Sequence, residues 1–299
     1  MKFRNLFTFC GAAVLALCAC SGKTDAAGAA STSESNSTAM TQTTTPDTAS
    51  ARVKIDTNMG SFTVLLYGDT PKHRDNFLRL VDTNYYDGTL FHRVIKDFMI
   101  QAGDPDSKTA APGQQLGAGG PGYKIDAEIV FPKHFHKRGA LAAARQGDQV
   151  NPMRQSSGSQ FYIVTGTVLS EPELAQMENH LRQSQMQRAF NELALQQRAN
   201  IIAMQQRGDR AGLQALQDTL IQQASRAAAE QGAGMTEEMR QAYTTVGGTP
   251  HLDGDYTVFG EVVDGMDVVE RIQNVATAPG DRPREDVKIL HMEVLPAAN

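Results

Sequence analysis

Apolar and polar residues alternate over 52–67. On both sides of a turn at 58–60, every second residue is apolar: Val53, Ile55, Phe62, Val64 and Leu66. Successive side chains of a strand point to opposite faces of a sheet, so a period of two indicates a strand with one buried face. The pattern therefore predicts a hairpin over 52–67.

A helix is expected directly after this hairpin. Thr70-Pro71 offers an N-cap and a proline in the first turn, and the apolar residues Phe77, Leu80 and Val81 give the helix a buried face. A second helix is expected over 266–273. Short strands are predicted near 90–95, 98–102, 127–130, 139–143, 160–165, 256–262 and 287–294. Many short strands with two helices predict a mainly β fold, a closed antiparallel barrel capped by helices.

Between Val168 and Gly248 the pattern changes to a helical period in a glutamine-rich stretch. Ser170-Glu171-Pro172-Glu173 has the form of a capping box, Gly208-Asp209 ends one helix and starts the next, and Thr236 can cap a third. Apolar residues mark the buried sides of the first two helices: Leu174, Met177, Leu181, Phe190, Leu193, Ile201, Leu213, Leu216, Leu220 and Ile221. We predict a helical insertion at 169–248. It is either a solvated decoration that packs its own apolar stripe or an arm that binds client proteins.

The first residues have the composition of an export signal. Lys2 and Arg4 precede an apolar run over 6–19 that is short for a membrane-spanning helix. Residues 1–19 are therefore predicted to be a signal peptide. The three cysteines, Cys10, Cys18 and Cys20, all lie in or at the end of this segment, so the remaining chain has none to pair in a disulfide.

Leu17-Cys18-Ala19-Cys20 resembles a bacterial lipobox, which implies lipidation of Cys20; an ordinary signal peptide cut near Ala19 is the alternative. Residues 20–51 are rich in Ser, Thr and Ala and cannot bury enough apolar surface to fold, so they are expected to form a disordered tether. A doubly acylated cysteine anchors firmly. Ser21 is not the aspartate that retains some bacterial lipoproteins in the inner membrane. We expect a lipoprotein of the bacterial cell envelope, on the outer membrane and facing the periplasm.

Three motifs carry the chemistry, and each places polar residues among apolar ones. They are FHRVIKDFMIQAGD at 91–104, GSQFYIV at 158–164 and LDGDYTVFGEV at 252–262. In this order they resemble the cyclophilin family of peptidyl-prolyl cis-trans isomerases, over roughly 52–168 and 249–295. The resemblance implies eight strands and two helices. It also implies a cyclophilin-like domain at 52–296 that the helical insertion interrupts.

The resemblance implies a reaction in which no covalent bond is made or broken. Rotation about an X–Pro bond faces a barrier of about 18–20 kcal/mol, because the C–N bond has partial double-bond character. In the twisted state the prolyl nitrogen becomes pyramidal and more basic, and a fixed cation that donates a hydrogen bond to it lowers the barrier. Arg93 matches the family's catalytic arginine. Gln101 matches the glutamine that contacts the substrate backbone and helps to hold Arg93. No cofactor and no metal is needed.

The remaining motif positions imply a substrate-binding surface. The residues that match the family's proline pocket and its rim are Phe98, Met99, Ala144, Arg145, Gln160, Tyr162, Leu252 and Tyr256. Four positions depart from the pattern: Tyr162 stands for Phe, Arg145 for Asn, Tyr256 for His and His251 for Trp. The loss of the tryptophan predicts weak binding of cyclosporin. The hydroxyl of Tyr162 needs a hydrogen-bond partner.

Alternative interpretations exist for several of these residues. Without the motifs, Phe98, Met99 and Leu252 would be interpreted as ordinary core residues. His134 and His136 could face one way on a strand, but two histidines are too few to indicate a metal site. The net charge of −5 gives no sign of a nucleic-acid surface. The sequence favours an isomerase that assists the folding of proline-containing exported proteins over a binding module that only holds clients.

Overall fold

The computed structural model describes residues 49–230 and 234–296. The predicted signal peptide, Cys20 and nearly all of the predicted tether lie outside these residues. Among the helices of the described part, none is both long and apolar enough to cross a membrane.

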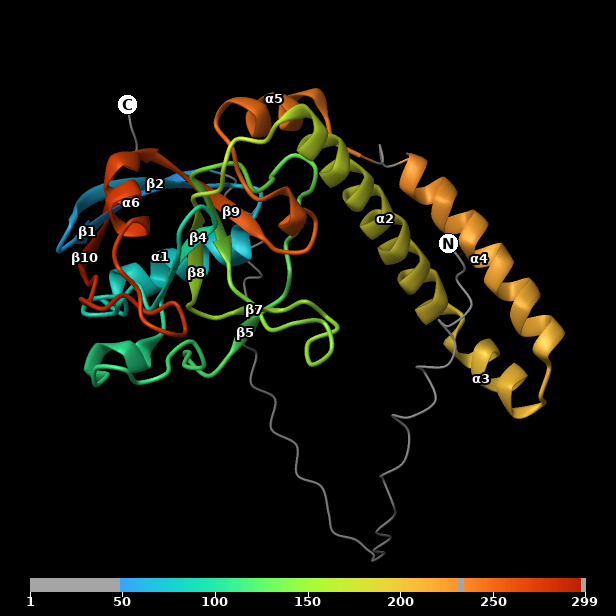
Figure 1. The fold of residues 1–299 in the computed structure, drawn as a ribbon. Coiled ribbons are helices and arrows are strands. Elements are labelled where there is room, and N and C mark those ends of the chain that lie inside the picture. The colour runs from blue at the N-terminus through green and yellow to red at the C-terminus, as the bar shows by residue number, and fades with distance from the viewer. Residues whose placement is uncertain (1–48, 231–233, 297–299) are drawn as a thin grey trace, which may run out of the picture. The chain divides into compact units, whose positions relative to one another are not determined.

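One antiparallel sheet organises the described residues (Figure 1). Its strands follow the order β10-β1-β2-β9-β6-β8-β4-β3. Their bounds are β1 (Ala51–Thr57), β2 (Gly60–Leu66), β3 (Arg93–Ile95), β4 (Met99–Ala102), β6 (Ala140–Ala143), β8 (Phe161–Val164), β9 (Val258–Asp264) and β10 (Ile289–Leu295). A separate pair joins β5 (Lys124–Ile125) to β7 (Ser156–Ser157). The hairpin predicted at 52–67 is confirmed as β1 and β2, with Val53 paired to Val64.

The sheet is an open half-barrel, so the prediction of a closed barrel is wrong. Strands β3 and β10 are its two edges. The chain just before β3 bridges the gap in part: the Phe91 N–H donates to Val287 O, and Thr89 O accepts from the N–H of Ile289, the first residue of β10, both at 2.9 Å. Because β3 has only three residues and pairs with β4, a continuous ladder does not reach β10.

The main core lies between this sheet and two helices, α1 (Pro71–Asp82) and α6 (Met266–Gln273). Phe77, Leu80 and Val81 of α1 are buried as expected. Each such side chain contributes about 1.5–3 kcal/mol through removal of apolar surface from water. Among the buried residues of α6 are Val268, Val269 and Ile272, which complete the apolar cluster from the other helix.

Residues 127–130 do not form the predicted strand, because Glu128 bonds instead to the start of α1 and to Thr257, the residue before β9. Its N–H donates to the Thr257 hydroxyl, and its carboxylate accepts from the N–H groups of Lys72 and His73, all at 3.0 Å. A carboxylate at a helix N-terminus stabilises the unpaired N–H groups there. Thr70, which the sequence indicated as the cap, donates its hydroxyl to Tyr67 O instead.

Four helices occupy the segment predicted to be a helical insertion: α2 (Glu171–Gln196), α3 (Arg198–Gln206), α4 (Arg210–Glu230) and α5 (Glu237–Thr245). Helices α2 and α4 run side by side (Figure 1) and share an apolar cluster that contains Phe190, Leu220 and Ala224. Within this segment, the capping predictions at Ser170 and Thr236 are confirmed. Glu173 accepts from the Ser170 N–H, and the Thr236 hydroxyl accepts from the Met239 N–H. The first predicted helix is interrupted at Gln197, which separates α2 from α3.

The two ends of this helical segment meet at a glycine joint. The Gly248 N–H donates to Thr167 O at 3.1 Å, and the Thr249 N–H donates to His136 O at 2.9 Å. A Cβ atom on Gly248 would lie 2.3 Å from His136 O, and the φ of Gly248 is +153°. Only glycine fits this close approach of three backbone segments.

Candidate active site

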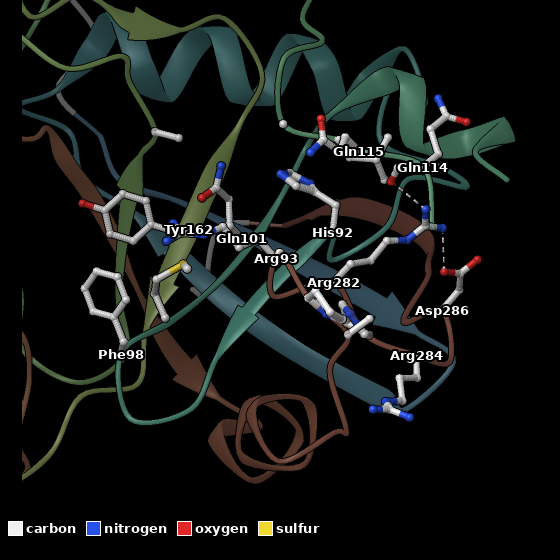
Figure 2. A pocket seen from close by; sticks show the side chains of 18 of the residues that line it. His92, Arg93, Phe98, Gln101, Gln114, Gln115, Tyr162, Arg282, Arg284 and Asp286 are labelled. Carbon is white, nitrogen blue, oxygen red and sulfur yellow. Dashed lines mark hydrogen bonds and ion pairs between the residues drawn. The ribbon is translucent and has the colours of Figure 1, made fainter. Parts of the chain in front are cut away.

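A cleft of about 1030 Å³ lies over one end of the sheet, and all but one of the predicted catalytic and substrate-binding residues line it. Strands β3, β4 and β8 place Arg93, Gln101 and Tyr162 in one row, since Arg93 pairs with Gln101 and Gln101 pairs with Tyr162. Cross-strand neighbours lie on the same face of a sheet. Figure 2 shows Phe98 and Tyr162 at one end of the cleft and Arg282, Arg284 and Asp286 at the other.

Arg93 is held loosely. Its Nε lies 3.4 Å from Asp281 Oδ2, and the two side chains are 41% and 45% exposed. An ion pair this long and this exposed contributes little to stability. The guanidinium can therefore turn toward a ligand in the cleft at low cost while it keeps its charge.

Gln101 has a different partner from the one expected. Its Nε2 donates to Gln160 Oε1 at 3.0 Å, and Asp281 is the residue that contacts Arg93. Gln160, the predicted residue that does not line the cleft, lies behind Gln101 and donates its Nε2 to Gly117 O and Gly119 O at 3.0 and 2.7 Å. Gln160 thus fixes both the Gln101 amide and the glycine-rich loop at the cleft wall.

An apolar hollow adjoins Arg93 and Gln101. It is formed by one cluster, in which Met99 and Tyr162 are buried and Phe98, Ala144, Leu252 and Tyr256 are partly buried. The Tyr162 and Tyr256 rings meet edge to face at 5.9 Å, and the Phe98 ring stacks on His251 at 5.4 Å. A concave apolar surface with one polar edge suits a small ring carried by a polar backbone.

Arg145 is occupied by contacts within the protein. Its side chain is 6% exposed, its Nε donates to Asp255 O at 2.8 Å and its Nη1 bonds Asp148 Oδ1 at 2.5 Å. The guanidinium lies 4.5 Å from the centre of the Tyr256 ring, within the range of a cation–π contact. The side chain therefore holds Tyr256 in place, a role that the motif comparison did not indicate.

The hydroxyl of Tyr162 finds its partner in His136, whose Nε2 lies 2.9 Å away. His136 Nδ1 lies 2.9 Å from Asp253 Oδ1, and the Tyr243 hydroxyl of α5 donates to Asp253 Oδ2 at 2.6 Å. Burial raises the pKa of Tyr162 well above its ordinary value, so the hydroxyl keeps its proton. Sequence reasoning missed His136, Asp253 and Tyr243 as neighbours of the site.

Two other histidines, His134 and His92, have environments separate from that of His136. His134 Nε2 bonds Asp69 Oδ1 at 2.7 Å and its ring stacks on Tyr67, so His134 and His136 serve different partners. Within the described ranges, no group of three or more residues that could hold a metal ion is present. Burial lowers the pKa of His92, which lines the cleft, and this favours the neutral ring.

Comparisons with known proteins agree with this geometry. The family described as "Cyclophilin type peptidyl-prolyl cis-trans isomerase/CLD" matches residues 52–181 and 220–294. A Staphylococcus saprophyticus protein named "Putative peptidyl-prolyl cis-trans isomerase" is 30% identical over 241 residues, 80% of this chain and 89% of its own. A Staphylococcus aureus protein of the same name is 29% identical over 246 residues, 81% of this chain and 91% of its own.

A solved structure has the same fold. The crystal structure of a cyclophilin type peptidyl-prolyl cis-trans isomerase from Cryptosporidium parvum superposes with a TM-score of 0.50 at 22% identity. The match covers 84% of this chain and 100% of that one. The chain belongs to the cyclophilin-type peptidyl-prolyl cis-trans isomerase family. It is an enzyme that accelerates rotation about X–Pro bonds.

Proposed function

We propose that this isomerase acts on exported, proline-containing proteins and assists their folding at the bacterial cell envelope, where a lipid on Cys20 anchors it to the outer membrane on the periplasmic side. The catalytic part of the proposal rests on one observation. A loosely held guanidinium, an amide and a buried aromatic ring stand in a row beside an apolar hollow.

In this arrangement the hollow of Phe98, Met99, Tyr162 and Leu252 takes the proline ring and fixes it. Arg93 then donates a hydrogen bond to the prolyl nitrogen, which becomes a better acceptor as the amide twists. That bond is stronger in the twisted state than in the planar ground state, which is the condition for acceleration. A guanidinium suits the task because it is always charged and its donors are rigidly placed.

Substrate backbone beyond the proline is held by polar groups at the cleft wall. Gln101 presents its amide to the cleft, and Gln160 fixes that amide from behind. Ala144, directly after β6, lines the cleft, but both of its backbone groups bond within the protein: its N–H donates to Gln160 O at 3.0 Å and its O accepts from the Ser157 N–H at 2.8 Å. The Arg145 side chain is engaged with Asp255, Asp148 and Tyr256.

The catalytic assignment is tested by isomerisation of a short Ala-Pro peptide by the full chain and by Arg93→Ala. We expect the substitution to lower kcat/KM by about a hundredfold, the usual effect of removing one hydrogen-bond donor that stabilises the transition state. Arg284→Ala is the matched control, since Arg284 lines the other end of the same cleft and bonds Thr277 O. Activity that survives in Arg93→Ala, with the control also active, contradicts the proposed role.

The proposed anchoring at the cell envelope is tested by detection of a lipid on Cys20. Cells that express the full chain are labelled with a radioactive fatty acid, and we expect the label and the membrane-bound fraction to be lost in Cys20→Ser but kept in Cys18→Ser. Equal labelling of both variants would contradict the assignment to Cys20. An unlabelled, soluble wild-type protein would contradict the anchor itself.

A further inference from the structure

A buried chain of hydrogen bonds runs from the candidate proline pocket into the helical insertion. It passes from the Tyr162 hydroxyl to His136, from His136 to Asp253, and from Asp253 to the Tyr243 hydroxyl of α5. The side chains of His136 and Asp253 are 1% and 0% exposed, and Tyr243 is fully buried. The insertion thus supplies the last group of a network that begins at a residue of the cleft.

Asp253 depends on this network. Its carboxylate accepts from the His136 backbone N–H at 2.8 Å, faces the His136 ring and accepts the Tyr243 hydroxyl. A carboxylate removed from water is costly unless its oxygens are hydrogen-bonded. Because the carboxylate is an acceptor, Nδ1 of the His136 ring carries a proton, and in the neutral ring Nε2 then accepts from the Tyr162 hydroxyl. Each member of the chain therefore orients the next.

A second contact joins the insertion to the loop that carries Asp253. Arg188 of α2 bonds Asp255 Oδ1 at 2.9 Å, and Arg154 approaches the same oxygen at 3.2 Å. The backbone oxygen of Asp255 accepts from Arg145, whose guanidinium packs on the Tyr256 ring. Asp253 and Asp255 lie between the pocket residues Leu252 and Tyr256, so the insertion holds this short loop at two points.

We propose that the helical insertion is a positioning element of the isomerase. Helix α5 through Tyr243, and α2 through Arg188, set the places of Tyr162, Leu252 and Tyr256 against the proline ring. None of these insertion residues touches the substrate. The proposal rests on the proposed use of the cleft as the prolyl site, and it adds a determinant of substrate affinity outside the family's motifs.

The test uses the full chain with Tyr243→Phe, which removes one hydroxyl and keeps the ring packed against Phe135. The readout is the Kd of an Ala-Pro dipeptide measured by NMR titration, together with KM and kcat for a longer peptide. We expect Kd and KM to rise about fivefold, the size of one net hydrogen bond, with kcat changed less than about twofold. Thr244→Val is the control, because it removes a neighbouring hydroxyl of α5 that bonds only Arg240 O and Gln241 O.

Two further variants keep the proposal falsifiable. Arg188→Gln should also raise Kd, by about twofold to threefold, as its ion pair is closer to solvent. Tyr162→Phe by itself should weaken binding. Added to Tyr162→Phe, Tyr243→Phe should raise Kd by less than it does by itself, because the two hydroxyls are the two ends of the same series of hydrogen bonds. Melting temperatures are measured for every variant, and binding is measured well below them.

Unchanged Kd and KM in both Tyr243→Phe and Arg188→Gln would overturn the proposal, even if the melting temperatures fall. Strict additivity of Tyr243→Phe and Tyr162→Phe would overturn the coupling through His136 and Asp253. The dipeptide titration also separates this inference from the catalytic proposal. If Arg93→Ala stays active, the assignment of Arg93 fails while the affinity readout still decides whether the insertion positions the pocket.

Discussion

The two ends of the helical insertion differ in what they bury. The near end, defined here as residues 171–182 and 236–245, packs Leu174, Leu181, Met239 and Tyr243 against Phe135 outside the insertion, and all five are buried. The far end, defined as residues 190–221, carries most of a separate apolar cluster between α2 and α4, which also includes Met186, Ala189 and Ala224. Helix α3 of the far end has no buried residue, and Leu195 and Ile202 are 66% and 40% exposed.

This difference shows that one insertion can combine two structural roles. The near end extends the core of the enzyme and reaches the pocket through the bond from Tyr243 to Asp253, while Arg188, between the two ends, reaches it through Asp255. The far end is a helical hairpin that packs on itself, as the interpretation of a solvated decoration expects. An arm that binds clients remains a hypothesis, and the exposed apolar residues place it at the far end.

The largest expected effect comes from a pair of deletions that compares the two ends of the insertion. When residues 170–247 are replaced by a short glycine linker, Asp253 loses Tyr243 and Asp255 loses Arg188, so we expect kcat/KM to fall at least about tenfold. When only residues 190–221 are replaced by a tight turn between α2 and α4, activity should stay within about twofold of wild type. Equal losses in both deletions would show that the comparison between the ends is wrong.

Cavity-forming substitutions give the next largest effect. Leu174→Ala at the near end removes a buried side chain and should cost about 3 kcal/mol of unfolding free energy. Ile202→Ala at the far end removes a partly exposed one and should cost less than about 0.5 kcal/mol. Urea unfolding followed by circular dichroism measures both. Similar costs at the two positions would mean that the near end is not part of the core.

Low pH should destabilise the packing of α5 on α2 at the near end. The Glu178 carboxylate contacts Arg240 of α5 and bonds Arg182 at 2.7 Å. Partial burial alone would raise the pKa of Glu178, but the bonds and charges of the two arginines outweigh it and lower the pKa below the ordinary 4.5. A lowered folded-state pKa means that this stabilisation is present above pH 4.5 and is lost as the pH falls through the folded-state value.

Hydrogen exchange of α5 amides at decreasing pH measures this loosening. We expect Glu178→Gln to cost about 1 kcal/mol at neutral pH and to remove most of the acid sensitivity of α5. An α5 that is equally protected at pH 3 and pH 7 in the wild type would contradict the role of Glu178. The α2–α4 cluster of the far end serves as the internal reference, because apolar side chains form it.

The smallest expected effect tests the hypothesis of a client-binding arm. Leu195→Gln should change unfolding free energy by less than about 0.5 kcal/mol and leave isomerisation of a short peptide unchanged, since the side chain is largely exposed. Suppression of aggregation of an unfolded protein is measured beside it. A loss there, with isomerisation intact, would support client binding at the far end, whereas no change would argue against it.

The sequence predicted the local helices and strands well, but it did not predict that the sheet stays open. Period-two alternation located β1 and β2, and capping chemistry located the starts of α2 and α5. Alternation reports which face of a strand is buried, but it does not report whether β3 meets β10. The apolar stretch at 127–130 was predicted to be a strand because its pattern could not show that Glu128 bonds to the start of α1.

In the candidate site, too, the sequence predicted the residues that line the cleft better than the partners that hold them. Motif positions brought Arg93, Gln101, Tyr162 and Leu252 to one cleft. The motifs could not indicate the partners of Tyr162, because His136 lies 26 residues before it and Tyr243 lies in a segment without motifs. One signal was available: Tyr162 stands where the family usually has Phe, and a buried hydroxyl requires a partner.

The glycine joint at Gly248 bears on how such isomerases can diversify. The chain leaves the half-barrel at Thr167 and returns beside it, so the strands on either side are held at the same separation whatever lies between. The entropy of closing a loop rises only with the logarithm of its length, about 0.6 kcal/mol for each doubling. Helices can therefore be lengthened, shortened or exchanged between paralogues at this joint without a shift in strand register, and evolution can alter an enzyme's accessory parts there while its catalytic framework stays fixed.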